Sequence, residues 1–243
     1  YGRAPQVAGG KGVPPRNGLA ALVTGAALAV GVLVLGAIAK LGPVAALDLR
    51  VDRHIAAHDR TGALTAAAKA ATDVAKPETV GIGLMIAVPL ILVLARRRAD
   101  AVKVLCMFGG AFALAEAGKR LIGEHRPPAA LQAMAADSSP SYPSGHAAVA
   151  AVLAVALTVI ATAAAWRYAA IVAGGLFAAA VAVSRVYLGD HYPLDVIGGM
   201  LCALAAGFVV TGLAALPPVR SRLRRLDPPR TRRGTPAPPA GAG

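Results

Sequence analysis

Long apolar stretches, separated by short polar segments, make up most of the chain. A membrane-spanning helix needs about 20 mostly apolar residues, and six stretches reach or approach that length. The second and third are the shortest, and the polar segment 96–100 divides them. The pattern predicts an all-helical fold, a polytopic membrane protein with six transmembrane helices. The six stretches are residues 19–41, 79–95, 101–118, 147–165, 169–187 and 194–216.

A different pattern occupies residues 42–78, between the first two apolar stretches. Apolar residues such as Leu47 and Val51 recur at helical spacing, with charged residues between them. We expect one or two amphipathic helices lying on the membrane surface. His54 and His58 are four residues apart and could bind a metal together, but no third ligand is obvious nearby. We therefore interpret both histidines as part of a solvent-facing side.

The composition also indicates a membrane protein. Hydrophobic residues make up 56% of the chain and charged residues 15%, whereas a soluble domain carries about 25% charged residues. The net charge of +13 would suit nucleic-acid binding, but only 4% of the residues are aromatic, which argues against a base-stacking surface. We expect the phospholipid bilayer, and no nucleic acid, as partner. Cys106 and Cys202 lie inside apolar stretches, without disulfide or zinc-ligand spacing.

Basic residues predict the orientation, because cytoplasmic loops of membrane proteins carry an excess of Lys and Arg. They gather in the N-terminal tail, after the second stretch, at Arg167 after the fourth, and in the C-terminal tail. With six spans, all four places lie on one side, which we take as cytoplasmic. The predicted organisation is a cytoplasmic basic tail over 1–18, a six-span domain over 19–216, and a basic, Pro-rich, disordered cytoplasmic tail over 217–243.

Three short polar clusters interrupt the apolar chain: residues 119–127, 143–146 and 184–195. Polar side chains at membrane depth are costly and therefore usually functional. The first cluster follows the third span, the second precedes the fourth, and the third links the fifth to the sixth. The six-span topology thus brings all three to the same face of the membrane, the outer one.

The basic residues of these clusters suit a phosphate group. Lys119, Arg126 and Arg185 could meet its negative charge, and arginine offers planar paired donors. Each could equally be a flanking residue whose charge reaches the headgroups. Lys119 could also pair with Glu116, three residues earlier on the same helix. The residue types alone leave both interpretations open.

The second cluster lies at the predicted start of a helix. Backbone amides at a helix N-terminus favour anions, so Ser144 and Gly145 could hold a phosphate, although Ser144 could also be a plain N-cap. His146 follows directly and could donate a proton to a leaving oxygen.

The third cluster contains His191 and Asp195, four residues apart. A carboxylate can orient a histidine and stabilise its charged form. Pro193 makes a regular helix through both doubtful, so we expect proximity only. His191 could then attack phosphorus and form a phosphohistidine. The neighbouring Asp190 and His125 are interpreted as solvent-facing loop residues.

The order and spacing of the clusters resemble the signature of the type 2 phosphatidic acid phosphatase superfamily, which also contains vanadium haloperoxidases. That signature is a lysine, six residues and Arg-Pro, then Pro-Ser-Gly-His, then Ser-Arg, five residues, a histidine, three residues and an aspartate. Every position matches. The matching residues are Lys119, Arg126, Pro127, Pro143, Ser144, Gly145, His146, Ser184, Arg185, His191 and Asp195.

The resemblance implies a role for each matching residue. Phosphate would be bound by Lys119, Arg126, Ser144, Gly145 and Arg185. His191 would be the nucleophile, Asp195 its partner and His146 the acid and base. The resemblance also implies no catalytic metal and no cofactor, which agrees with the lack of a carboxylate cluster suited to magnesium.

A site at the membrane surface suits a membrane lipid phosphate as substrate, since the lipid tail can stay in hydrocarbon. We expect an integral cell-membrane enzyme whose site faces outside and whose termini are cytoplasmic. Polyprenyl diphosphate is slightly preferred over phosphatidic acid and phosphatidylglycerol phosphate. A vanadate-dependent haloperoxidase is a less favoured enzyme. A lipid-phosphate binder or transporter without chemistry is an alternative of another class, although binding alone would not need both histidines.

Overall fold

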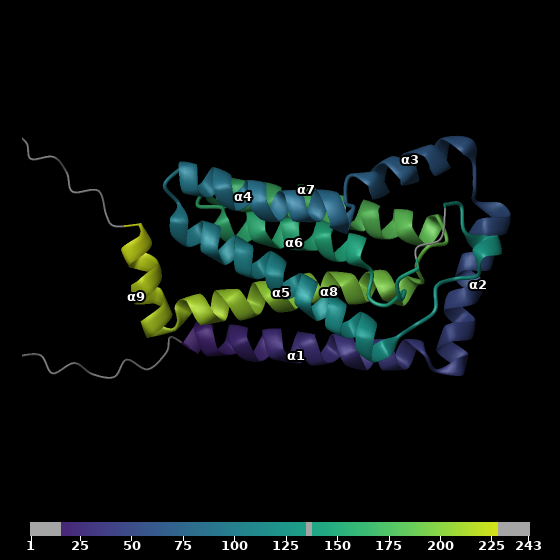
Figure 1. Cartoon of the computed structure of the whole chain (residues 1–243), viewed down its shortest axis with the longest axis horizontal. Coiled ribbons are helices and arrows are strands. Elements are labelled where there is room, and N and C mark those ends of the chain that lie inside the picture. The colour runs from purple at the N-terminus through teal and green to yellow at the C-terminus, as the bar shows by residue number, and fades with distance from the viewer. Residues whose placement is uncertain (1–15, 135–137, 228–243) are drawn as a thin grey trace, which may run out of the picture.

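The structure is a computed structural model, described for residues 16–134 and 138–227. All regular elements within these two ranges are helices (Figure 1). The six predicted apolar stretches each coincide with a helix. These helices are α1 (Arg16–Ala39), α4 (Ile82–Leu94), α5 (Arg98–Ile122), α6 (Gly145–Ile160), α7 (Ala164–Tyr187) and α8 (Pro193–Ala215).

Four of these helices, α1, α5, α7 and α8, are long and apolar enough to cross a membrane. Helices α4 and α6 have 13 and 16 residues and are shorter than a full span. A single turn of π-helix, Pro77–Gly81, leads directly into α4 and lengthens it. The all-helical prediction is therefore confirmed, while length and composition support four spans and not six.

Helix α6 lies in the middle of the bundle and packs against α5, α7 and α8. Its first turns are buried on every side, since Ala147, Ala148, Val149, Ala150, Ala151 and Val152 are all buried. A helix that is apolar all round is typical of a buried position. Its neighbours contribute large core side chains, among them Met107 and Phe108 of α5 and Val181 of α7.

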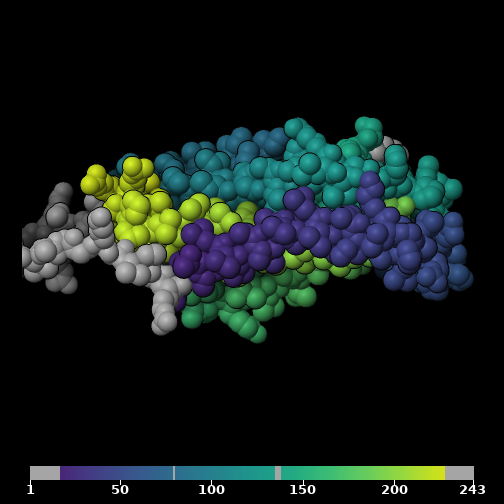
Figure 2. All heavy atoms as spheres, turned by 90° about the horizontal axis from the view of Figure 1, so that it is seen from below, coloured from purple at the N-terminus to yellow at the C-terminus, as the bar shows by residue number. Residues whose placement is uncertain are grey.

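Helix α1 packs along α8 over much of its length. A Cβ on Gly25 would lie 2.8 Å from the backbone nitrogen of Val209, so only glycine permits this approach. Small residues play this role between helices in lipid. The other side of α1 is exposed along the surface (Figure 2), with Val23 and Val30 each 61% accessible. Exposed apolar side chains of this kind suit contact with lipid.

Two further helices, α2 (Gly42–His58) and α3 (Gly62–Asp73), occupy the segment 42–78. The prediction of one or two helices there is confirmed, and Figure 1 places both at one end of the bundle. His54 and His58 are exposed, with stacked rings 4.7 Å apart, as expected for a solvent-facing side. The opposite side of α2 is not simply apolar, because it buries Asp48 and Asp52.

The link between α2 and α3 is tied to the bundle through Arg60. Its guanidinium donates to the carbonyl oxygens of Tyr187, at 3.1 Å, and Leu131, at 2.6 Å. Thr72 of α3 also shares a hydrogen bond of 3.0 Å with Ser184 of α7. These contacts hold α2 and α3 against the ends of α7 and α8.

The predicted disordered tail over 217–243 is partly wrong. Residues Pro217–Leu226 form helix α9, which starts with proline at its first position, where the missing N–H costs nothing. The Asp227 carboxylate accepts hydrogen bonds from the backbone amides of Arg98 and Ala99, at 3.0 and 2.9 Å. The predicted tail over 228–243 and most of the predicted tail over 1–18 lie outside the described residues.

The bundle therefore has two chemically distinct ends (Figure 1). One end carries α9 and the link between α4 and α5, where the Arg97 guanidinium also contacts the carbonyl oxygen of Ile160 at the end of α6. The other end carries α2, the segments 123–134 and 138–144, and the turn 188–192. The predicted gathering of the three polar clusters at one end is confirmed.

Candidate active site

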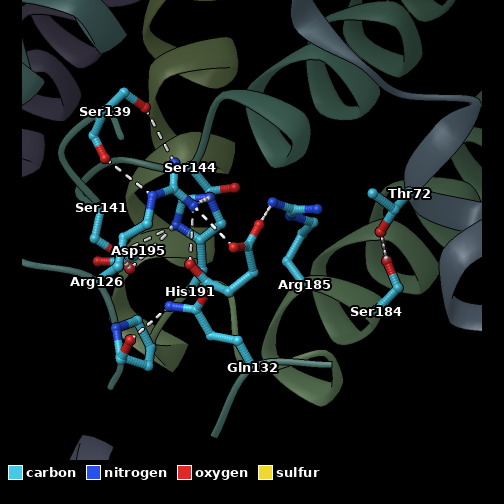
Figure 3. A network of polar contacts seen from close by, with 12 residues as sticks. Thr72, Arg126, Gln132, Ser139, Ser141, Ser144, Ser184, Arg185, His191 and Asp195 are labelled. Carbon is cyan, nitrogen blue, oxygen red and sulfur yellow. Dashed lines mark hydrogen bonds and ion pairs between the residues drawn. The ribbon is translucent and has the colours of Figure 1, made fainter. Parts of the chain in front are cut away.

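The segment that leaves α5 carries Arg126 into the centre of the site. Gly123, with φ of 59°, ends α5 in the left-handed conformation that favours glycine. The Arg126 guanidinium then donates to the carbonyl oxygen of Ser139 at 2.9 Å and to its hydroxyl at 3.1 Å (Figure 3). It also donates to the carbonyl oxygen of Asp190 at 3.0 Å. Arg126 thus joins all the loops of the site.

Lys119 lies in the last turn of α5, and its ammonium donates to the Ser139 hydroxyl at 3.2 Å. The alternative pair with Glu116 is wrong, because Glu116 accepts instead from Arg120, at 3.0 Å. Arg120 lies four residues beyond Glu116 and shares its exposed side of the helix. Lys119 is therefore turned toward the site and linked to Arg126 through one serine.

Arg185 and Asp190 form an ion pair inside the site, and both are nearly inaccessible, at 2% and 3%. The Asp190 carboxylate also lies 3.3 Å from the Arg126 guanidinium. The interpretation of Asp190 as a solvent-facing residue is therefore wrong, whereas His125 is exposed as predicted. The cause is the turn at Gly189, whose φ of 71° directs the next residue inward.

His191 is held by Asp195 as predicted, with Nδ1 3.2 Å from the carboxylate Oδ2. The same oxygen accepts from the Ser141 hydroxyl and, at 2.8 Å, from the Tyr192 amide. When Nδ1 carries the proton, the lone pair of the ring lies on Nε2. Nε2 lies 3.4 Å from the Arg126 guanidinium. Helix α8 starts only at Pro193, so proximity and not a helical face joins the pair.

Ser144 caps α6, and its hydroxyl accepts from the Ala147 amide at 3.5 Å. Its own amide donates to the Asp195 carbonyl oxygen at 2.9 Å, which joins the start of α6 to the start of α8. Gly145 opens α6 beside Pro77, where an added Cβ would lie 3.1 Å from the proline ring. The N-cap interpretation of Ser144 is confirmed, and the amides of the first turn of α6 lie at the site.

His146 lies in the first turn of α6 and is half-buried. It faces α3, where the pKa of Asp73 is lowered by its hydrogen bond with Lys76 and, less strongly, by the charge of His146. His146 therefore lies near enough to α3 for its charge to act on Asp73.

Three site residues lie outside the sequence signature: Ser139, Ser141 and Asp190. Ser139 and Ser141 belong to the serine-rich run just before the second cluster, and this run of small polar residues was the signal in the sequence that could have indicated them. For Asp190 the signal was weaker, an acidic residue next to His191. Their partners come from distant segments, so spacing alone could not assign them.

Three more carboxyl groups, those of Glu124, Asp48 and Asp52, lie near enough to Asp195 for its charge to act on them. Burial and the charge of Asp195 raise the pKa of Glu124 to about 8. Burial, followed by the charges of neighbouring carboxylates, raises the pKa of Asp48 to about 6 and that of Asp52 to about 7. Within the described residues, Glu124 Oε2 and Asp195 Oδ1 are both buried without a hydrogen-bond partner. With its pKa raised to about 8, the Glu124 carboxyl holds its proton at neutral pH.

The described residues contain no group of three or more His, Cys, Asp or Glu side chains arranged to hold a metal ion. A polar opening of about 360 Å³ leads from Arg126 to the surface, lined by residues 123–126 and 138–140. Two apolar hollows lie farther from the charges. The first, about 490 Å³, lies between α2, α7 and α8, and the second, about 480 Å³, lies farther along α6, α7 and α8.

The sequence model of the PAP2 superfamily matches residues 100–215, a range that holds all three polar clusters. Residues 100–215 belong to the PAP2 superfamily. The family that the signature resembles is thereby confirmed. Within this PAP2 domain lie all eight predicted site residues and most of α5 together with α6, α7 and α8.

Relatives of the PAP2 domain include membrane phosphatases. An undecaprenyl-diphosphatase of Sulfolobus acidocaldarius is 31% identical over 137 residues, which are 54% of this chain and 63% of that protein's length. The crystal structure of a transmembrane PAP2-type phosphatidylglycerolphosphate phosphatase from Bacillus subtilis superposes with a TM-score of 0.68. The match has 25% identity and covers 78% of this chain and 94% of that one.

A second solved structure, Aquifex aeolicus LpxE, has a TM-score of 0.54 and 20% identity over 68% of this chain and 94% of that one. At this identity it shows a shared fold alone. Both structural matches extend beyond residues 100–215 and include part of the chain outside the PAP2 domain.

Proposed function

We propose that the protein is an integral membrane phosphatase that hydrolyses the phosphate or diphosphate of a lipid. The observation that carries this proposal is the buried network in which Asp195 orients His191 and Arg126 lies beside Nε2 of that histidine. An oriented nucleophile next to a guanidinium suits attack on a phosphate. The family and the names of the relatives support the same reaction class.

In the proposed first step, the His191 Nε2 lone pair attacks phosphorus and the bond to the lipid oxygen breaks. His146 donates its proton to that leaving oxygen. Lys119, Arg126 and Arg185 neutralise the phosphate, and the amides that follow Ser144 and Gly145 cradle it. Asp195 stabilises the positive charge that develops on His191.

In the second step, the neutral His146 takes a proton from water, and the water oxygen attacks phosphorus. The bond between phosphorus and His191 breaks, orthophosphate leaves, and both histidines return to their starting states. The protein's own cationic side chains and helix N-terminus supply the charge stabilisation, so the proposed cycle uses no metal and no cofactor.

The apolar hollows support a lipid as the substrate. The hollow between α7 and α8 is lined by Pro193 and Val196, the residues that flank Leu194 and Asp195 in the sequence. The next hollow continues along the same helices past Met200 and Phe208. A lipid tail lying there would keep its headgroup phosphate at the level of His191 while its hydrocarbon stays away from water.

Among lipids we favour a polyprenyl diphosphate, which the name of the Sulfolobus relative supports. Phosphatidylglycerol phosphate, named for the Bacillus structure, and phosphatidic acid are the alternatives. The three share a terminal phosphate, which is the part that the charged network would contact. Phosphate release from a panel of these lipids, compared by kcat/KM, separates them.

We also propose that all six bundle helices lie in the membrane, in a domain over 19–216 with basic cytoplasmic segments on either side. Helices α4 and α6 are short for a span, but α6 is enclosed by α5, α7 and α8. An enclosed helix need not match the thickness of the bilayer by itself. The arginines of α9 and of the α4–α5 link favour that end as cytoplasmic, so that the site faces outside.

The decisive experiment is phosphate release by the purified protein in detergent, in the presence of EDTA. His191→Ala should abolish release, whereas His58→Ala, which changes an exposed histidine of α2, should leave it unchanged. Near-normal release by His191→Ala would contradict the proposed nucleophile. A strict need for magnesium would contradict the metal-free mechanism. A wild-type protein that binds lipid phosphate without releasing orthophosphate would instead be the non-catalytic binder.

A further inference from the structure

The pocket assigned to the substrate's phosphate contains a negative charge of the protein itself. The Asp190 carboxylate pairs with the Arg185 guanidinium through one oxygen and lies 3.3 Å from the Arg126 guanidinium through the other. Both arginines extend toward the centre of the site in Figure 3. They are two of the residues that the proposed function assigns to phosphate, so Asp190 occupies part of the same position.

A physical reason for this arrangement lies in the burial of the arginines. Arg185 is 2% accessible, and the Arg126 side chain is only 8% accessible. Two buried guanidinium groups without a counter-charge would repel each other and lose their hydration. Asp190, itself 3% accessible, supplies that counter-charge. The Asp190 carboxylate therefore stabilises both guanidinium groups at the position that the proposed function assigns to phosphate.

The backbone of Asp190 is held independently of its side chain. Its amide donates to the Arg185 carbonyl oxygen at 3.1 Å, and its carbonyl oxygen accepts from Arg126 at 3.0 Å. Rotation of the side chain alone can therefore remove the carboxylate from the arginines. Such a rotation leaves the next residue, His191, in place, still oriented by Asp195.

We propose that Asp190 is a displaceable internal counter-ion, which the phosphate of the substrate must replace to bind. The proposal rests on the assignment of Arg126 and Arg185 to phosphate in the proposed function. A dianionic phosphate offers three oxygens and two charges to the arginines and can replace one carboxylate. An anion with a single charge gains less by that exchange. Asp190 thus favours terminal phosphates, which carry two charges, over anions with a single charge. By competing for the arginines, it also weakens the binding of orthophosphate, the product.

Replacement of Asp190 by asparagine provides the test, because it keeps the size of the side chain and removes its charge. Orthophosphate, titrated calorimetrically into the detergent-purified protein, should bind Asp190→Asn at least about tenfold more tightly than wild type, a change of about 1.4 kcal/mol. Vanadate should likewise bind Asp190→Asn more tightly than it binds the wild-type protein. Glu116→Gln removes an exposed acid that pairs with Arg120, and its affinity should equal that of wild type.

An ion pair with a purely structural role predicts the opposite result. Asp190→Asn would then loosen the arginines and bind orthophosphate as weakly as wild type or more weakly, which would overturn the proposal. Asp190→Ala provides a second variant if the asparagine protein does not fold. Tighter binding of orthophosphate by this variant would support the proposal, and binding no tighter than wild type would overturn it. Asp190→Glu retains the charge and should retain weak binding. Tight binding by that variant would also contradict the proposal.

The binding experiment needs no turnover, so its outcome is separate from that of the proposed function. If His191→Ala keeps its phosphate release while Asp190→Asn binds orthophosphate more tightly, the nucleophile is wrong and the counter-ion stands. If His191→Ala is inactive while Asp190→Asn binds orthophosphate no more tightly than wild type, the nucleophile stands and the counter-ion proposal is wrong. In an active enzyme, inhibition of Asp190→Asn by orthophosphate should strengthen by the same tenfold factor.

Discussion

At the scale of the residue, one carboxylate oxygen contacts three neighbouring groups in the site. Oδ2 of Asp195 contacts the His191 ring, the Ser141 hydroxyl and the Tyr192 amide. Hydrogen bonds to a buried carboxylate fix its position and stabilise its charge. Ser141 does not touch the phosphate pocket directly, so it acts on the reaction through the orientation of Asp195 and His191.

Ser141→Ala should therefore lower kcat about tenfold with little change in KM, since a hydrogen bond to a charged group contributes about 1.5–3 kcal/mol. Steady-state phosphate release provides the measurement, and Ser221→Ala, on the exposed surface of α9, provides the control. Rescue by Ser141→Thr, which restores a hydroxyl, would distinguish positioning from a loss of fold. An unchanged kcat in the alanine variant would show that Ser141 does not orient the pair.

The pKa of Glu124 leads to a prediction about pH and stability. Its ordinary value of 4.5 is raised to about 8 by burial and by Asp195. The unfolded chain therefore loses this proton at lower pH than the folded protein. The stabilisation is complete below about pH 4 and is lost as pH rises toward 8.

Thermal unfolding in detergent between pH 5 and 8.5 should therefore show a Tm that falls with rising pH. Glu124→Gln should flatten that dependence, because the amide does not titrate. Glu116→Gln, at an exposed carboxylate, should keep the wild-type slope. Equal slopes for wild type and Glu124→Gln would contradict the assigned protonation state.

At the scale of the element, the site depends on the contact between the starts of α6 and α8. The Ser144 amide donates to the Asp195 carbonyl oxygen, and Gly199, in the second turn of α8, lies directly against the Ser144 carbonyl oxygen. A Cβ on Gly199 would collide with that oxygen, which belongs to the backbone and cannot rotate away. The absence of a side chain at this position allows the first turns of α6 and α8 to pack this closely.

Gly199→Ala should push the two helices apart, with a cost to stability of about 1–3 kcal/mol. Activity should fall more than tenfold even at temperatures where the variant stays folded, because the acid and the nucleophile would no longer share one phosphate. Phosphate release and Tm should be measured together. Gly109→Ala on α5, where an added Cβ meets nothing within 4 Å, is the matched control. Full activity in a folded Gly199→Ala protein would contradict the expected separation.

At the scale of the whole molecule, the chemistry is confined to one end of a helical bundle. The buried network lies beside α2, while α9 with its arginines lies at the opposite end (Figure 1). The helix surface between the two ends carries exposed apolar residues, such as Leu176 and Val183 of α7. A bundle of this kind suits a site at one membrane surface with a lipid tail beside the helices.

The proposed orientation predicts which end a membrane-impermeant thiol reagent reaches in intact cells. In a Cys106→Ala background, His125→Cys at the mouth of the site should be labelled at once. Arg222→Cys on α9 should be labelled only after permeabilisation. Labelling in the reverse order would show that the site faces the cytoplasm. The background protein, which keeps only the buried Cys202, gives the baseline.

The amino-acid sequence by itself predicted the positions of the helices and most of the candidate site residues. Apolar length and helical periodicity are local properties, so the six stretches and the segment 42–78 could be assigned without a fold. The spacing of Lys119, Arg126, His191 and their partners in the signature was equally readable along the chain. Connectivity of the helices then sufficed to gather the three clusters at one end.

Only the tertiary structure decided which side chains meet. From the sequence, Asp190 was interpreted as a solvent-facing loop residue. In the structure, the turn at Gly189 directs its side chain between two arginines. Ser139 likewise obtains its contacts with Lys119 and Arg126 from a different segment of the chain. The physical reason is that burial and pairing of charges depend on neighbours brought together by packing, which no local pattern of hydrophobic and polar residues contains.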